Sequence, residues 1–327
     1  DIPFSGTGEN LAEASKPAYF ECSMGRIALI GVTSSFHDSY AAGPQNQDMQ
    51  GRPGVAPLRH QAVYELDKNN YKALLDISKA IGINSYHNQA IKEGYLLDNK
   101  NFKFGIYEFK EVDNRVYTFP NEGDLQRTIA EIADAKYQSD IVIVSIHSHQ
   151  FTDGNKQIPP EFIKIFAHEC VDAGANIVVC HGPHVVRGIE AYHSSLIFHG
   201  LGNFIFQHEE VEYLPEEFYR KYCKTRETVT GVGEIMSIRS KNGMIGLCTQ
   251  PDVWKSVIVS VNCGIDFLEA RLYPVEIMLK GKRGLKGLPV LTSDLAIIEK
   301  IKTLSMDFGT EIKIANKNFG SIRISRV

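Results

Sequence analysis

The chain has 327 residues, which is enough for one large α/β domain or two smaller ones with a sizeable buried core. Its apolar fraction of 43% and charged fraction of 23% are those of an ordinary globular protein. The net charge of -4, with no sustained basic run, argues against a nucleic-acid partner. No apolar stretch reaches the roughly 18 residues that a membrane-spanning helix needs.

The six cysteines are scattered along the chain and form no C-x-x-C pair, which argues against a zinc ribbon or a thioredoxin-type motif. We interpret them as free thiols, and these favour a reducing, cytoplasmic environment. No signal peptide is recognisable, but the chain begins at Asp1 and not at Met. The alternative localisation is therefore the cell surface, reached through an anchor on a preceding segment.

The first third of the chain combines a strand, a long loop and a helix. Residues 25–32 are predicted to form a short buried strand, and a loop rich in Gly and Pro follows over 33–60. Residues 64–81 show helical spacing of apolar positions, and Gly82 suits the C-terminal cap of that helix. A hairpin-like segment is predicted at 102–119.

Strands and helices alternate in the middle of the chain. The predicted elements are a helix at 124–138, a strand at 140–146, a helix at 159–173, and strands at 175–179 and 196–198. This alternation predicts an α/β domain whose sheet is largely parallel.

The last third is predicted to be rich in β-structure from about residue 230. The predicted elements are strands at 230–240, 244–247, 256–262 and 268–278, a helix at 293–308, and closing strands at 312–314 and 321–324. A basic, glycine-rich segment, Lys280–Gly287, is interpreted as a surface loop.

Histidines are concentrated in the middle of the chain, where eight of the eleven lie between His147 and His208. His147 ends the 140–146 strand, and the stretch IVVCHGPHVV places His181 and His184 just after the next strand. The carboxyl ends of parallel strands line the crevice where α/β proteins bind ligands. If these strands are neighbours, the imidazoles converge there, and neutral imidazole is the commonest protein ligand for divalent transition metals.

Each histidine has a simpler interpretation. His181 and His184 can be turn residues that hydrogen-bond the backbone, and His149 can be solvated or support the ligands. The remaining candidates are His199, which follows the 196–198 strand, His168 inside a helix, and the unplaced His37 and His60. A site built from histidines alone suits one zinc ion, whereas a paired-metal hydrolytic site also needs carboxylates. The first hundred residues contain no D-x-H or G-D motif to supply them.

Three motifs carry a resemblance to a known family. IHSH at 146–149, CHGPHVVRGIE at 180–190 and LIFHGLGNFIF at 196–206 resemble the CapA-type poly-γ-glutamate capsule synthesis proteins, which belong to the calcineurin-like metallophosphatase superfamily. GTGENLAEASKPAYFE at 6–21 and GRPGVAPLR at 51–59 also fit, so the resemblance covers nearly the whole chain as one domain over residues 1–327. The family's first motifs, a Gly-Asp, an Asn-Glu and an Asn-Asn-His, are absent, and we interpret the chain as lacking the family's N-terminal part.

The resemblance implies a fold and a site. The fold is a metallophosphatase-like four-layer α/β/β/α sandwich with mixed sheets, whose N-terminal strands lie outside this chain. The site binds divalent metal ions (Mn, Fe or Zn), two of them in the complete protein. By position, His147, His181 and His184 correspond to metal ligands, and His147 and His184 to the catalytic residues.

The resemblance also implies metal-assisted hydrolysis connected with capsule biosynthesis, with a small molecule or an anionic polymer as substrate. Arg52, Arg59 and Arg187 are candidates for binding that substrate, because a guanidinium matches phosphate or carboxylate oxygens. Asn203 is a further candidate that either orients a ligand or caps a turn. The alternative is a non-catalytic protein that binds or guides the anionic polymer.

Overall fold

A computed structural model describes residues 2–23, 25–98, 101–207, 211–315 and 319–325. Its contacts divide the chain into two compact units. The larger unit comprises Asp1–Pro57, Thr128–Pro159 and Ala167–Val327, and the smaller comprises Leu58–Arg127 and Pro160–Phe166. Because this division rests on contacts and not on family boundaries, the single domain expected over residues 1–327 stays a prediction.

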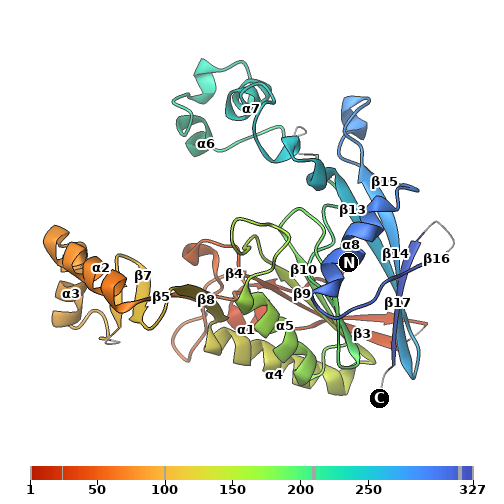
Figure 1. The fold of residues 1–327 in the computed structure, drawn as a ribbon, viewed down its shortest axis with the longest axis horizontal. Coiled ribbons are helices and arrows are strands. Elements are labelled where there is room, and N and C mark those ends of the chain that lie inside the picture. The colour runs from red at the N-terminus through yellow and green to blue at the C-terminus, as the bar shows by residue number, and fades with distance from the viewer. Residues whose placement is uncertain (1, 24, 99–100, 208–210, 316–318, 326–327) are drawn as a thin grey trace. The chain divides into compact units, whose positions relative to one another are not determined.

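A six-stranded mixed sheet forms one half of the larger unit (Figure 1). Across the sheet its strands are β11 (Ile189–Tyr192), β12 (Ser195–Phe198), β10 (Ile177–His181), β9 (Ile141–His147), β3 (Gly25–Thr33) and β2 (Ala18–Cys22). The four inner strands are parallel, and the two outer ones are antiparallel to their neighbours. The predicted strands that end near His147, His181 and His199 are therefore neighbours, as expected.

A second, antiparallel sheet packs against the first. Its strands are β13 (Lys255–Cys263), β14 (Phe267–Ile277), β15 (Pro289–Leu291), β16 (Lys313–Ala315) and β17 (Phe319–Ser325). Helix α8 (Ala296–Met306) completes this core, in which its Ile297, Ile298 and Ile301 pack with apolar residues of both sheets. A Cβ atom at Gly320 would lie 2.7 Å from Cγ2 of Ile298, so only glycine allows this close approach. The mixed α/β fold with two packed sheets is the expected class.

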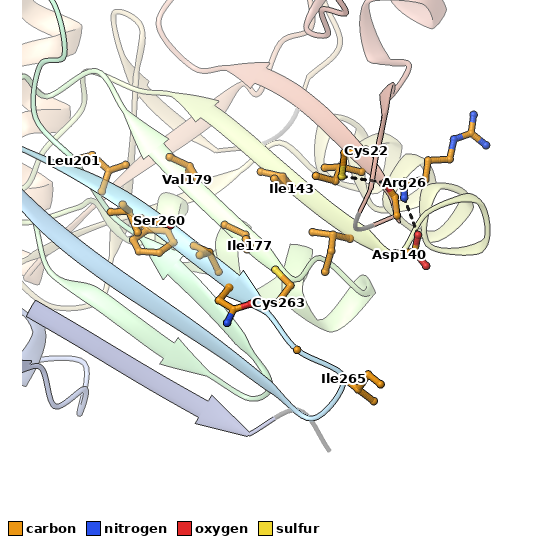
Figure 2. A pocket seen from close by; sticks show the side chains of 18 residues that line it. Cys22, Arg26, Asp140, Ile143, Ile177, Val179, Leu201, Ser260, Cys263 and Ile265 are labelled. Carbon is orange, nitrogen blue, oxygen red and sulfur yellow. Dashed lines mark hydrogen bonds between the residues drawn. The ribbon is translucent and has the colours of Figure 1, made fainter.

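A cavity of about 830 Å³, lined mainly by apolar side chains of the two sheets and open to solvent, lies between them (Figure 2). Ile143, Ile177 and Val179 line it from the six-stranded sheet, and Val259 and Val261 line it from β13. These residues alternate along their strands because side chains of one parity point to the same face.

The other elements of the larger unit are short strands and helices. They are β1 (Thr7–Gly8), β4 (Gly54–Val55), α1 (Leu11–Ser15), α6 (Glu216–Arg220) and α7 (Val232–Ser240). Two long helices, α4 (Glu122–Gln138) and α5 (Glu161–Ala173), match their predicted positions, and residues of each are assigned to both units. None of the helices in the described part of the chain is long and apolar enough to cross a membrane.

The prediction of β-structure from residue 230 is wrong. Residues 232–240 form α7, and the β-structure begins at Lys255. The Glu234 carboxylate accepts hydrogen bonds from the N–H and hydroxyl of Thr230, which fixes the start of the helix. Ile235 is fully buried in a small cluster with Tyr219 and Val229, and this tertiary contact decides the conformation.

The smaller unit contains a four-stranded mixed sheet and two helices. In sheet order these strands are β6 (Phe102–Phe104), β7 (Tyr107–Glu111), β5 (His60–Leu66) and β8 (Arg115–Pro120), and the helices are α2 (Lys68–Ile81) and α3 (Ser85–Lys92). The helix predicted from residue 64 starts at Lys68, because Asp67 accepts hydrogen bonds from the N–H groups of Asn69 and Asn70 as its N-cap. Gly82 is left-handed at φ 63°, as its predicted capping role requires.

Candidate functional site

His147 and His181 lie opposite each other at the carboxyl ends of β9 and β10. Their Nδ1 atoms are 3.0 Å apart, and the second nitrogen of His181, Nε2, is 3.0 Å from the hydroxyl of Ser145. Ser145 and His147 share one face of β9 because strand side chains alternate. The predicted convergence of His147 and His181 is therefore confirmed. Sequence analysis did not single out Ser145, although its position two residues before His147 places both side chains on the same face of the strand.

The loop that follows β10 is held in an unusual backbone conformation. Gly182 has a φ of 118°, and a Cβ atom there would lie 2.6 Å from the carbonyl oxygen of Ser148. His184 has a φ of 64°, which is uncommon for a residue with a side chain. Pro183 between them is buried and has a fixed φ. Such strain concentrates at functional sites.

Asn203 orients the imidazole of His184. The Asn203 Nδ2 donates to the carbonyl oxygen of Val253, which fixes the amide so that its Oδ1 faces His184 Nδ1 at 2.7 Å. Since Oδ1 can only accept, His184 carries its proton on Nδ1 and keeps the lone pair on Nε2 free. Metal-binding histidines are commonly fixed in this way.

His149 joins the cluster as a fourth imidazole. Its Nε2 lies 3.2 Å from Nε2 of His147, and its ring stacks on that of His184 with centroids 5.5 Å apart. Its backbone N–H donates to the Ser35 hydroxyl, which ties the loop after β9 to the loop after β3. We call His147, His149, His181 and His184 the histidine cluster.

Burial keeps most of this cluster uncharged near neutral pH. Loss of solvation, with the neighbouring imidazoles of His181, His149 and His184, lowers the pKa of His147 to about 4. Burial also lowers the pKa of His149 and of His181, with smaller contributions from His184 and His149 respectively. Neutral imidazoles keep a lone pair that can bind a cation or accept a proton.

Two cavities adjoin the histidine cluster. One, of about 410 Å³, is lined by His147, His181 and Ser145 together with Thr33 and Tyr40. The other, of about 470 Å³, opens beside His184. The cluster is therefore accessible to a small molecule from both cavities.

The donor type of this cluster fits a divalent metal, but the donor set is incomplete. Two ligands of a tetrahedral zinc ion, with bonds of about 2.0–2.1 Å, lie about 3.3 Å apart, which is close to the separations of the paired imidazole nitrogens. However, His147 faces its two partners with different nitrogens. Within the described residues no three His, Cys, Asp or Glu side chains are grouped to hold a metal ion.

His199 lies apart from this cluster, contrary to the expectation that all the strand-end imidazoles converge. It is fully buried, its Nε2 bonds Glu190 at 3.0 Å, and its ring stacks on Phe308. The same Glu190 carboxylate accepts from His168 of α5 at 2.8 Å. These contacts favour a structural role for both histidines.

Arg187 is buried beneath the loops of the site. Its Nε donates to the carbonyl oxygen of Lys156 and its Nη2 to that of Gln150, and burial lowers its pKa to about 10. The proposed substrate contact of Arg187 stays a prediction, while the observed bonds brace the segment after His149.

The other two predicted arginines belong to different units. Arg52 is exposed in the larger unit and donates to the carbonyl oxygens of Ala41 and Asp38. Arg59, in the smaller unit, pairs with the buried Asp124 at 3.2 Å. Their role in substrate binding stays a prediction.

Three further histidines lie in varied surroundings. His37 bonds the hydroxyl of Ser39 in the loop after β3, and His60 stacks on Phe162 in the smaller unit. His208 is outside the described residues.

Known bacterial proteins resemble this chain over stretches of different length. It is 30% identical over 333 aligned residues to two uncharacterized proteins of Sinorhizobium fredii, y4sH and y4uA, and the alignments cover 99% of this chain and 70% of each relative. A shorter stretch of 78 residues is 42% identical to the PGA biosynthesis protein CapA of Bacillus subtilis and covers 24% of this chain and 20% of that protein. The capsule biosynthesis protein CapA of Bacillus anthracis is 38% identical over 87 residues, or 26% of this chain and 20% of that protein.

The family match covers the histidine cluster itself. Residues 1–208 match the family described as bacterial capsule synthesis protein PGA_cap, and this range includes β3, β9 and β10 and the loops that follow them. Together with the relatives aligned over nearly the whole chain, this match shows that the chain belongs to the PGA_cap family of bacterial capsule synthesis proteins.

Proposed function

We propose that this chain is a metal-dependent, hydrolase-like component of capsule biosynthesis that acts on an anionic substrate. Membership of the PGA_cap family links the chain to capsule synthesis. The observation that carries the hydrolase proposal is the histidine cluster, in which four imidazoles meet at the ends of two parallel strands.

His147, His181 and His184 are the proposed metal ligands, with Mn, Fe or Zn as the candidate ions and two ions in the complete site. A bound divalent cation supplies Lewis-acid polarisation of a phosphoryl or acyl oxygen. The chain's own contribution is to keep His147 neutral and to hold the proton of His184 on Nδ1. The free Nε2 of His184 then faces the site as a donor or as a proton acceptor.

A non-catalytic role is the second candidate, in which the protein binds an anionic polymer and the histidine cluster stabilises the loops. The incomplete donor set within the described residues favours it. The basic segment Lys280–Gly287 is the densest group of positive charge that such a polymer would meet.

Metal content tests the proposal first. The purified chain is incubated with Mn²⁺, Fe²⁺ or Zn²⁺ and desalted, then bound metal and hydrolysis of a generic phosphodiester are measured. The double variant His147→Asn/His181→Asn is the test, and His193→Asn, which changes an exposed histidine on the β11–β12 turn, is the matched control. A version extended by the codons upstream in the source genome is measured in parallel.

The proposal expects bound metal in the chain or in its extended version, lost in the double variant and kept in His193→Asn. Turnover that follows the metal content supports the hydrolase role. Absence of bound metal from every version would refute it and favour the polymer-binding role.

A further inference from the structure

The cavity of about 470 Å³ beside His184 extends beyond the histidine cluster and is not used by the proposed metal site. Its walls come from α7, from residues 243–248, from Phe206 and from Arg283 on the loop between β14 and β15. This volume lies within the roughly 300–1,000 Å³ of typical small-ligand sites. We call it the α7 pocket.

Apolar side chains form much of the α7 pocket. Met236, Ile245 and Leu247 line it together with Phe206. The Phe206 ring lies 6.0 Å from that of His184 and 5.5 Å from that of Trp254, between centroids. A ligand that reaches from the histidine cluster into the α7 pocket therefore passes the Phe206 ring.

The charged groups of the α7 pocket are positive, and the serines Ser237 and Ser240 add neutral hydroxyls. Arg239 and Arg283 line it, and the described lining contains no Asp or Glu. Within the described residues, neither guanidinium forms an ion pair, and that of Arg239 lies 5.8 Å from the centre of the Phe218 ring. Guanidinium groups without a carboxylate partner are suited to bind phosphate or carboxylate oxygens.

We propose that the α7 pocket binds a second oxyanion of the ligand held at the histidine cluster, through Arg239 and Arg283. The ligand is then a molecule with two anionic groups, carboxylates or phosphates, separated by an apolar spacer that lies along Phe206 and Met236. This inference rests on the proposed function, because it takes the histidine cluster as the place where the first anionic group binds.

The fold allows a clean test of the two arginines. Tyr219, Val229 and Ile235 anchor α7 in their own buried cluster, to which neither arginine belongs. Arg271 and Arg323 offer a matched control, since both are exposed on the five-stranded sheet and their removal changes the net charge equally.

The experiment measures binding by isothermal titration calorimetry on the chain without added metal. The probes are a linear γ-linked pentaglutamate, for a carboxylate ligand, and inorganic phosphate. The variants are Arg239→Gln/Arg283→Gln and the control Arg271→Gln/Arg323→Gln. For one of the two probes, the proposal expects the Kd to rise at least tenfold in the first variant and to change less than twofold in the control.

Each outcome is decisive. Dependence on the two arginines for the pentaglutamate alone assigns a carboxylate ligand, and dependence for phosphate alone assigns a phosphate ligand. Equal weakening in both double variants, or no binding of either probe, overturns the inference. Metal content and phosphodiester hydrolysis depend on His147 and His181 instead, so failure of the proposed function gives a different result.

Discussion

Single side chains set the chemistry of the histidine cluster, and Asn203 shows how. Its Nδ2 donates to the carbonyl oxygen of Val253, so its amide oxygen faces His184. This oxygen accepts a hydrogen bond from Nδ1 of His184 and thereby selects the Nδ1-protonated tautomer of the imidazole. The proton position on His184 is thus decided by a residue nineteen positions away in the chain.

Replacing Asn203 by Ala removes this control. We expect the His184 ring to populate both tautomers, and the free energy of unfolding to fall by about 1–3 kcal/mol, because the buried carbonyl of Val253 and the partly buried Nδ1 of His184 lose their partner. Nitrogen-15 chemical shifts of the ring in the metal-free chain report the tautomer, and any metal affinity should fall about 10–100-fold. Asn262→Ala, an exposed asparagine on β13, is the control. A single unchanged tautomer in Asn203→Ala would contradict the assignment.

Gly182 sets the direction of the loop that carries His184. An Ala at this position needs a positive φ, costing about 1–2 kcal/mol, and its Cβ also collides with the carbonyl of Ser148. Gly154→Ala is the matched control, since Gly154 has a φ of 71° but nothing within 4 Å of its Cβ position. Chemical denaturation should show a clearly larger loss for Gly182→Ala, and equal losses would mean that the loop relaxes freely.

At the scale of the helices and strands, sequence patterns correctly predicted those elements whose conformation is decided by residues close in the chain. Strands β9, β10 and β12 are continuous apolar runs, so both their positions and the meeting of His147 with His181 followed from the rule for parallel strand ends. Helix α7 was wrongly predicted as a strand. Its conformation depends on the burial of Ile235 against Tyr219 and Val229, which come from another segment and leave no local pattern. The burial of Arg187 and the Asn203–His184 bond likewise depend on loop conformations that no local pattern encodes.

The contact between β5 and α5 should make the free energy of unfolding depend on pH. His60 stacks on Phe162 with ring centroids 4.2 Å apart, and burial lowers the pKa of His60 below its ordinary 6.5. Because the unfolded chain binds this proton more tightly, stability falls as the pH drops below about 6.5 and levels off below the folded pKa. His60→Phe keeps the stacking and removes the titration.

The measurement compares the free energy of unfolding of the original chain and of His60→Phe at pH 7.5 and at pH 5. The difference between the two proteins should shift in favour of His60→Phe at the lower pH. A difference that is the same at both pH values would show that His60 is protonated equally well in the folded state.

In the larger unit as a whole, the two sheets share one hydrophobic core and leave a cavity of about 830 Å³ between them. Ile143, Val179 and Val261 line this cavity, and the same side chains pack against the buried core to which α8 contributes. An apolar cavity of this size in the native state is a place where a hydrophobic dye can bind.

We therefore expect the native chain to enhance the fluorescence of anilinonaphthalene sulfonate without denaturant. Val261→Phe, which fills the cavity, and Val261→Asp, which places a charge in it, should both reduce this signal. Val290→Asp is the control, because Val290 lies on β15 outside the cavity lining and is 47% exposed. Circular dichroism confirms that each variant is folded, and fluorescence that drops equally in all three variants would place the dye elsewhere. If Val261→Phe alone also raises the unfolding temperature, the cavity destabilises the original fold, because its lining side chains lack packing partners that the phenylalanine supplies.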